Sequence, residues 1–347
     1  MNFSEILLQW YPFNKRELPW RNTNNPYFIW LSEIILQQTR VEQGLPYYLK
    51  FIKAFPKVAD LANAKEDKVL KLWQGLGYYS RARNLHYSAK YILEYYDGIF
   101  PKTYSDILSL KGVGTYTAAA IASFSYGLPY AVVDGNVIRV LSRVFGIKTP
   151  SDTSLGRKEY QHVAQDLLNK KNAADNNQAI MEFGALQCTP KLPKCTSCPF
   201  ISNCFAYQTR SIGALPVKCK KIRIRKRFLN YLLIQNGKAI ILGKRNEGIW
   251  KGLYEFPFIE YANKKSEKAI ISSAEWIEFF KNTHYKIESV SDEFIHKLSH
   301  QHIYAKFWTV NIQDFELKNH SFIKNYRIKD YPVSRLTDKF LKEYNIT

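Results

Sequence analysis

Residues 110–122 read LKGVGTYTAAAIA, with two glycines that interrupt an apolar run directly before an alanine-rich segment. Glycine lets the backbone turn tightly and approach another group closely. The free N–H groups and the positive dipole end at the start of a following helix favour an anion such as phosphate. The stretch therefore predicts a hairpin at Gly112 and Gly114 before a helix over residues 115–125, with an ordinary turn as the alternative.

A carboxylate lies at the start of the next expected helix, which covers residues 137–145. Asp134 follows two valines and comes two residues before Asn136. An aspartate in this place is typical of a helix cap. The alternative is a fixed negative charge that stabilises a developing cation, with Asn136 orienting it.

A second carboxyl, that of Glu33, lies in an apolar segment whose helix Asn25 and Pro26 are expected to start. Burial on a largely apolar helix face raises the pKa of a carboxyl group, which suits a general acid. The alternative is a partly exposed glutamate paired with a basic residue. The helical neighbours of Glu33, three and four positions away, are Ile29, Trp30, Leu36 and Gln37.

Four of the five cysteines lie within residues 188–204, in the spacing C-x6-C-x2-C-x5-C. Four thiolates this close can hold one tetrahedral zinc ion or one iron–sulfur cluster, and the spacing alone does not separate the two. The clustering also argues against a secreted disulfide scaffold. Cys219 is left over as an ordinary thiol. The predicted metal ligands are Cys188, Cys195, Cys198 and Cys204.

The composition favours a polyanionic partner. The 347 residues carry 50 lysines and arginines against 30 acidic residues, a formal net charge of +20. Nucleic acid is the first candidate and an anionic membrane surface the second. No signal peptide is visible, and the longest uncharged stretch, 112–133, contains Gly127 and Pro129 and indicates a helix plus a loop. We therefore expect no membrane association and, from the missing targeting segment, a bacterial cytoplasmic location.

The residue pattern divides the chain. Residues 1–210 are predicted to be mostly helical, and residues 229–347 to form an α+β domain. The connecting segment 211–228 is strongly basic and has the character of a linker. Besides the helices already named, residues 65–73, 84–95 and 158–169 are expected to be helical.

Within the C-terminal part, Asn236-Gly237 lies between two apolar runs, which is the strongest short-range signal for a β-hairpin. Residues 269–281 are expected to form a helix. Residues 303–310 are expected to form a strand.

Together these motifs resemble one family. The glycine hairpin followed by VDGNV at 133–137 resembles the signature of helix–hairpin–helix DNA glycosylases, and the cysteine spacing is similar to the [4Fe–4S] ligands of their endonuclease III-like branch. LPWR at 18–21 and WLSEIILQQTRV at 30–41 are similar to the MutY family, adenine DNA glycosylases that act on adenine mispaired with 8-oxoguanine. The resemblance implies a catalytic region over 1–210, with its cluster loop at 188–204, and a [4Fe–4S] cofactor.

The resemblance also implies roles for individual residues. Glu33 would protonate the departing adenine and help to activate water. Asp134, held by Asn136, would stabilise the oxocarbenium-like sugar, and Tyr116 matches the active-site tyrosine of the family. The positions that match the adenine pocket are Arg16, Trp20, Arg21, Leu36 and Glu182; those that match DNA contacts are Gln38, Thr39, Tyr78, Gly112 and Gly114, with Gln38 and Tyr78 as wedges in the duplex and Thr39 against 8-oxoguanine.

Tyr116 also distinguishes two chemistries. Bifunctional enzymes of the endonuclease III branch use a hairpin lysine that forms a Schiff base with the sugar. The matching position here is Tyr116, flanked by two threonines, and amine catalysis needs an amine in place. The resemblance therefore implies a monofunctional glycosylase.

Residues 250–257, WKGLYEFP, resemble the Nudix-related domain of the same family, which checks the 8-oxoguanine strand. The acidic pattern of pyrophosphate-cleaving Nudix enzymes is absent after them, so this domain is expected to recognise and not to hydrolyse. Leu298, Ser299 and His300 lie where the family has a Phe-Ser-His loop, with leucine in place of phenylalanine.

The expected partner is double-stranded DNA with 8-oxoguanine:adenine or guanine:adenine mispairs, bound by a monomer. One alternative is a bifunctional pyrimidine-lesion glycosylase, against which Tyr116 and the C-terminal domain speak. Another is a non-catalytic iron–sulfur protein that binds lesions. The presence of both Glu33 and Asp134 speaks against this second alternative.

Overall fold

The computed structural model describes residues 2–219, 224–281, 283–313 and 320–346. Two compact units are present: Met1–Asn63 with Asn84–Lys220, and Ala64–Arg83 with Lys221–Thr347. The sequence pattern did not predict that 64–83 belong with the C-terminal part. The domain boundaries at 210 and 229 stay a prediction, and three basic residues of the linker, Lys220, Lys221 and Arg223, lie outside the described residues.

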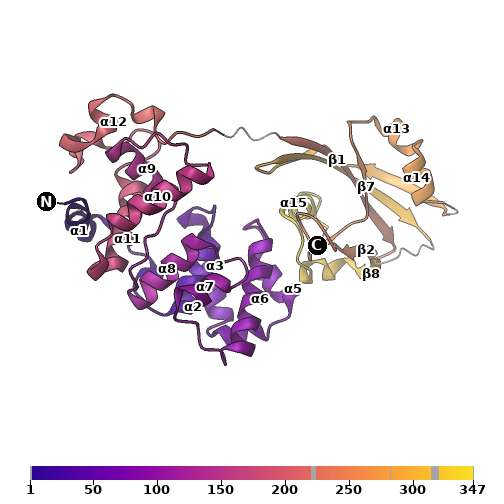
Figure 1. Ribbon diagram of the computed structural model, residues 1–347. Helices are drawn as coiled ribbons and strands as arrows, with labels where there is room; N and C mark the ends of the chain where they lie inside the picture. Colours follow the sequence, from indigo (N-terminus) through magenta and orange to yellow (C-terminus); the bar gives the residue numbers. More distant parts are fainter. Residues whose placement is uncertain (1, 220–223, 282, 314–319, 347) are drawn as a thin grey trace. The chain divides into compact units, whose positions relative to one another are not determined.

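The first unit is helical, as predicted (Figure 1). Helices α1, α9, α10, α11 and α12 form one group, and α2, α3, α7 and α8 another, with α11 in contact with both α8 and α9. No helix among the described residues is both long enough and apolar enough to cross a membrane. The helices are α1 (Phe3–Asn14), α2 (Pro26–Leu36), α3 (Val41–Ala54), α4 (Val58–Ala62), α6 (Ser80–Tyr95, from Asn84 onward in this unit), α7 (Tyr104–Ser109), α8 (Thr115–Tyr126), α9 (Gly135–Phe145), α10 (Ser154–Asp166), α11 (Ala173–Leu186) and α12 (Phe205–Gln208).

Local signals explain where these helices begin. The Asn25 side chain accepts a hydrogen bond from the Tyr27 N–H at 3.0 Å and caps α2, as expected. The glycine hairpin joins α7 to α8. Gly112 has a φ of +85°, and a Cβ on it would lie 2.7 Å from the Asn84 Cβ, so only glycine fits there. The predicted helix–hairpin–helix arrangement is therefore confirmed.

The second unit contains a sheet in the order β3-β2-β1-β7-β5, with β4 also on β1, β6 on β7 and β8 on β2. Strands β1 and β7 run parallel, and their side chains alternate between the two faces of the sheet. Leu232 and Trp308 lie with Trp276 of α14 in one core, whereas Phe307 stacks on Phe340 of α15 on the other face. The elements are α5 (Glu66–Trp73), β1 (Arg225–Asn236), β2 (Ala239–Lys244), β3 (Tyr254–Glu255), β4 (Phe258–Tyr261), α13 (Glu267–Ile271), α14 (Ala274–Phe279), β5 (Tyr285–Val290), β6 (Phe294–Lys297), β7 (Gln301–Ile312), β8 (His320–Lys324) and α15 (Arg335–Glu343).

The α+β prediction for the C-terminal part is confirmed in outline and wrong in one detail. Asn236 pairs with Ala239 across the predicted hairpin, and β7 covers the predicted strand. The single helix expected over 269–281 is two short helices. The helix is interrupted between them because the Ser273 side chain caps α14, accepting a hydrogen bond from the Trp276 N–H.

Candidate active site

Glu33 is buried in the first unit and is bound by a tyrosine. Its side chain lies on α2 with the residue only 7% exposed, and the Tyr116 hydroxyl from α8 donates to its Oε2 at 2.8 Å. Burial raises the pKa of Glu33 to about 7, although the Tyr116 hydrogen bond lowers it. The alternative of a partly exposed glutamate paired with a base is wrong. A carboxyl group that titrates near neutrality can give up a proton at physiological pH.

Asp134 is held as an oriented carboxylate at the N-terminus of α9. Its Oδ1 accepts hydrogen bonds from the backbone N–H groups of Asn136 and Val137, each at 2.8 Å, and its Oδ2 accepts from the Asn136 side-chain amide at 2.7 Å. Burial raises the pKa of Asp134, and these hydrogen bonds oppose that shift. Asp134 is close enough to raise the pKa of Glu33 through its charge. The helix-cap interpretation is therefore correct, and the cap hydrogen bonds hold the carboxylate in one orientation.

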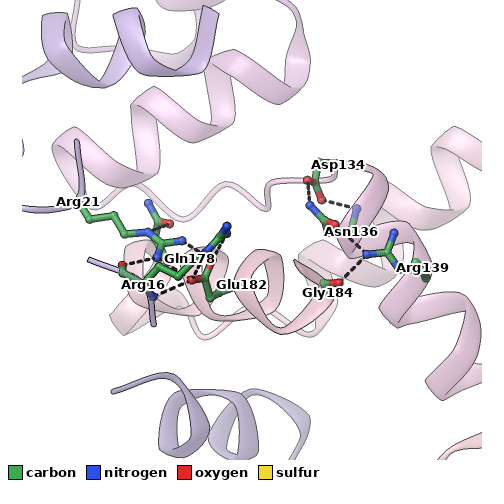
Figure 2. A network of polar contacts seen from close by, with 8 residues as sticks. All are labelled: Arg16, Arg21, Asp134, Asn136, Arg139, Gln178, Glu182 and Gly184. Atoms are coloured by element: carbon green, nitrogen blue, oxygen red, sulfur yellow. Dashed lines mark hydrogen bonds and ion pairs between the residues drawn. The ribbon is translucent and has the colours of Figure 1, made fainter. Parts of the chain in front are cut away.

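Arg139 binds Asn136 and Gly184 (Figure 2), and it also binds the cysteine loop at Cys188. Its Nη2 donates to the Asn136 Oδ1 at 2.8 Å and to the Gly184 carbonyl at 2.5 Å, and its Nε donates to the Cys188 carbonyl at 2.7 Å. A Cβ on Gly184 would lie 2.6 Å from the Asn136 Cβ, so α11 and α9 are in close contact here. Asn136 is thus fixed by Asp134 on one side and by Arg139 on the other.

A second polar cluster surrounds Glu182 of α11 (Figure 2). Arg16 and Arg21 each bind its Oε2 through Nη2 at 2.7 Å, and Arg21 also binds Gln178. Burial opposes ionisation of Glu182, but the arginine hydrogen bonds outweigh it and lower the pKa to about 2. Arg21 lies near enough to Glu33 to lower its pKa through charge. Arg21, one of the two arginines of this cluster, therefore lies near the Glu33 carboxyl group.

The remaining predicted residues of the first unit lie near α2. Trp20 is 6% exposed and packs its ring edge-on against Tyr48, with centroids 5.2 Å apart. Leu36 ends α2, and the Thr39 N–H donates to its carbonyl at 3.1 Å. Gln38 is exposed between them at a φ of +54°, a conformation uncommon for a residue with a side chain. The turn therefore projects Gln38 to solvent.

The second unit brings together four of the other predicted DNA contacts. Tyr78, Leu298, Ser299 and His300 all line one cavity of about 570 Å³. Tyr78 is 46% exposed at a φ of +48°, and the Ser299 Oγ lies 3.4 Å from the His300 Nδ1. Residues 298–300 follow β6 directly, so the sheet positions them at the cavity.

The four predicted cysteine ligands line one further cavity in the first unit. All are free thiols, and burial raises the pKa of Cys198 to about 11, which disfavours thiolates without a cation nearby. The Arg143 Nη1 lies 3.5 Å from the Cys188 Sγ. Within the described residues, no three or more His, Cys, Asp or Glu side chains are placed to hold a single metal ion. Four thiols around a shared space are compatible with an iron–sulfur cluster, which is larger than one ion.

Sequence reasoning missed the supporting residues of the site. Arg139 is a buried arginine in an apolar helical stretch, the same signal that singled out Glu33, and it could have been found in that way. Gln178 and Gly184 were missed because the residue pattern of α11 is weak, so this helix was not predicted.

Comparison with known proteins identifies both parts of the chain. Residues 31–165 match the family model "HhH-GPD superfamily base excision DNA repair protein", and residues 230–343 match "NUDIX domain". The chain is 39% identical to an adenine DNA glycosylase of Buchnera aphidicola subsp. Baizongia pistaciae, over 89% of this chain and 86% of that one. It is 35% identical to the adenine DNA glycosylase of Buchnera aphidicola subsp. Acyrthosiphon pisum over 98% of each chain.

A solved structure, that of a thermostable thymine-DNA glycosylase, is also similar. It superposes with a TM-score of 0.56 at 30% identity, covering 60% of this chain and 95% of that one. The fold of the first unit is therefore that of a DNA glycosylase.

Proposed function

Because this chain belongs to the adenine DNA glycosylase family, we propose that it excises adenine mispaired with 8-oxoguanine or guanine by hydrolysing the N-glycosidic bond. It is a DNA glycosylase of base excision repair. The observation that supports adenine excision is a buried carboxyl group with a pKa of about 7, Glu33, whose pKa is raised by the charge of a half-buried carboxyl group fixed by hydrogen bonds, Asp134.

Glu33 supplies the acid. Adenine leaves the sugar more easily once it is protonated, and a carboxyl with a pKa of about 7 holds its proton in part of the molecules at neutral pH. The Tyr116 hydroxyl, which donates to Glu33, orients the carboxyl group. After the proton has moved, the carboxylate helps to activate the attacking water.

Asp134 supplies a negative charge opposite to the positive charge that develops on the sugar. Loss of adenine leaves positive charge on the sugar, and a carboxylate that is already oriented stabilises that charge without reorganising. One carboxylic acid and one carboxylate are the pair that glycosidic cleavage generally uses. Asn136 and Arg139 position Asp134 through the contacts described above.

The substrate adenine must be rotated out of the duplex, at a cost of about a few kcal/mol. The ionised Glu182 holds Arg16 and Arg21 at the proposed adenine pocket, beside Trp20 and Leu36. The exposed side chains of Gln38 and Tyr78 are proposed to fill the gap in the duplex, and Thr39 to contact 8-oxoguanine.

Further contacts are proposed on both sides of the lesion. The hairpin at Gly112 and Gly114 presents backbone N–H groups to a phosphate at the start of α8. Leu298, Ser299 and His300 are proposed to read 8-oxoguanine at the cavity of the second unit. Leucine packs against a base but stacks less well than an aromatic ring, so discrimination would rest more on the serine and the histidine.

The cysteine loop is proposed to hold a [4Fe–4S] cluster through Cys188, Cys195, Cys198 and Cys204. The four free thiols around one cavity support this assignment. The four cysteine thiolates would ligate the iron of the cluster, and this ligation would fix the loop. The residues of the protein then connect that loop to Asn136 through Arg139.

Single-turnover incubation with an 8-oxoguanine:adenine duplex tests the function. Strand breaks that appear only after alkali support a monofunctional glycosylase, because hydrolysis leaves an abasic site intact. Breaks without alkali would indicate the bifunctional alternative. Tight binding without any breaks would indicate a lesion-binding protein and would overturn the proposal.

A further inference from the structure

One face of the sheet in the second unit is only partly covered. Where this face carries Leu232 and Trp308, it is covered by α14. Two and four residues earlier along β1, the same face carries Asn230 and Phe228, which pair in register with Lys306 and Tyr304 of β7. A cavity lies over these positions, and two buried residues of the same apolar core, Tyr261 and Ile270, form part of its lining.

The cavity has a volume of about 480 Å³, within the range of small-molecule sites. Its floor offers aromatic surface: the rings of Phe228 and Tyr304 lie parallel, 5.1 Å apart, and both side chains are half-buried. Tyr261 on the neighbouring β4 pairs with Phe228 and also lines the cavity, but it is only 5% exposed. The half-buried rings of Phe228 and Tyr304 suit a planar ring system such as a nucleobase.

The rim of the cavity is cationic. Its lining includes four lysines and two glutamates, so positive side chains are in excess by two. The glutamates are already engaged: Glu293 binds Lys264 at 3.0 Å, and Glu267 binds Lys306 at 2.6 Å. The remaining lysines, Lys265 and Lys268, are exposed, and the Lys265 Nζ lies 3.9 Å over the Tyr261 ring. Two ammonium groups beside aromatic rings suit a phosphate attached to a planar base.

We propose that this cavity binds a nucleotide, with the base on Phe228 and Tyr304 and the phosphate on Lys265 and Lys268. The site lies entirely on the second unit and uses none of the residues assigned to adenine excision or to 8-oxoguanine. The same chemistry is present in a free nucleoside monophosphate and in one residue of a DNA strand. These are two sources of one ligand, and the experiment below separates them.

Isothermal titration of the full chain tests the site with three probes: dGMP, inorganic phosphate and a twelve-nucleotide single strand. The first variant is the double substitution Lys265→Gln with Lys268→Gln, at exposed positions where folding is not at risk. The second is Tyr304→Leu, checked for folding by its thermal unfolding. The matched control is Lys281→Gln with Lys286→Gln, two exposed lysines of the same unit that do not line the cavity.

The expected result is saturable binding of dGMP, weakened about tenfold or more by each test variant and unchanged in the control, because stacking and phosphate contacts each contribute at that scale. If only the strand shows this dependence, the ligand is a nucleotide within DNA and the site extends the DNA contact. The proposal would be overturned if the affinity for every probe were the same in all variants as in the unsubstituted protein. Phosphate binding as tightly as dGMP would overturn it too, since the rings would then contribute nothing.

Adenine excision by the same variants separates this site from the proposed function. With enzyme in saturating excess over an 8-oxoguanine:adenine duplex, every variant should excise adenine at the same rate as the unsubstituted protein. If the chain excised no adenine at all, the nucleotide titration would still decide the proposal on its own.

Discussion

The proton held by a single buried side chain decides the proposed reaction. Glu33→Gln keeps the shape of the side chain and its contact with Tyr116 but cannot protonate adenine. We expect single-turnover excision to fall by about 10²–10⁴-fold while duplex binding is retained. Glu94→Gln, at an exposed position on α6, serves as the control. Normal turnover in the Glu33 variant would remove it from the role of acid.

The pH profile follows from the same carboxyl group. An acid must be protonated to act, so excision should be fastest below the pKa of Glu33, about 7, and should fall as the pH rises through it. The Tyr116 hydrogen bond lowers that pKa. Tyr116→Phe should therefore move the falling limb of the profile to higher pH, as measured by single-turnover rates between pH 5 and about 9.

Tyr126→Phe is the matched control for this shift, because Tyr126 also lies on α8 but bonds to the Phe100 carbonyl. The same midpoint in both variants would contradict the proposed coupling between Tyr116 and Glu33.

At the scale of elements, the contact of α11 with the start of α9 positions Asp134. A methyl group on Gly184 would meet both the Cβ and the backbone oxygen of Asn136, at 2.6 and 2.9 Å. Gly184→Ala should therefore displace Asn136, slow excision and lower the free energy of unfolding by about 1–3 kcal/mol. Thermal unfolding and single-turnover rates measure the two effects. Gly213→Ala, where a Cβ would meet nothing within 4 Å, should change neither.

Arg139 contacts both Asn136 at the start of α9 and the cysteine loop at Cys188, so its substitution should affect both places. Arg139→Met loses the hydrogen bonds to Asn136 and to the Cys188 carbonyl, so excision and bound iron should both decrease. Arg143→Met loses contacts to the Thr189 and Pro190 carbonyls but touches neither Asn136 nor Asp134. Two measurements distinguish the Arg139 and Arg143 variants: the iron content of each protein, and the excision rate divided by the fraction of chains that carry iron. Equal excision loss per loaded chain in both variants would show that Arg139 acts only through the loop.

Local sequence signals predicted the elements that carry the proposed catalytic groups. The Asn25 cap, the hairpin glycine with φ of +85° and the Asp134 cap are all local features, and the structure confirms each of them. The break at Ser273 was missed because apolar spacing on both sides of a capping serine imitates one continuous helix. Helix α11 was missed because its pattern is weak, although it supplies Glu182 and Gly184.

At the scale of the whole molecule, the net charge of +20 should govern affinity for DNA. Neutralising phosphates releases counterions, so the logarithm of the binding constant should fall linearly with the logarithm of salt concentration. For about six phosphate contacts the affinity should decrease by about 10³-fold between 50 and 200 mM salt. Fluorescence anisotropy with a labelled duplex measures the slope, and a flat profile would contradict binding through phosphates.

Residues close together along the chain were enough to predict the class of fold, the two carboxyl groups, the cysteine set and the family. Folding was needed to show that Tyr116 donates to Glu33, 83 positions away, and that Arg16 and Arg21 bind Glu182. It also decided that sheet register leaves a lysine-rimmed cavity on the second unit. Burial and long-range hydrogen bonds set the pKa values of buried carboxyls, and no local pattern of residues encodes either one.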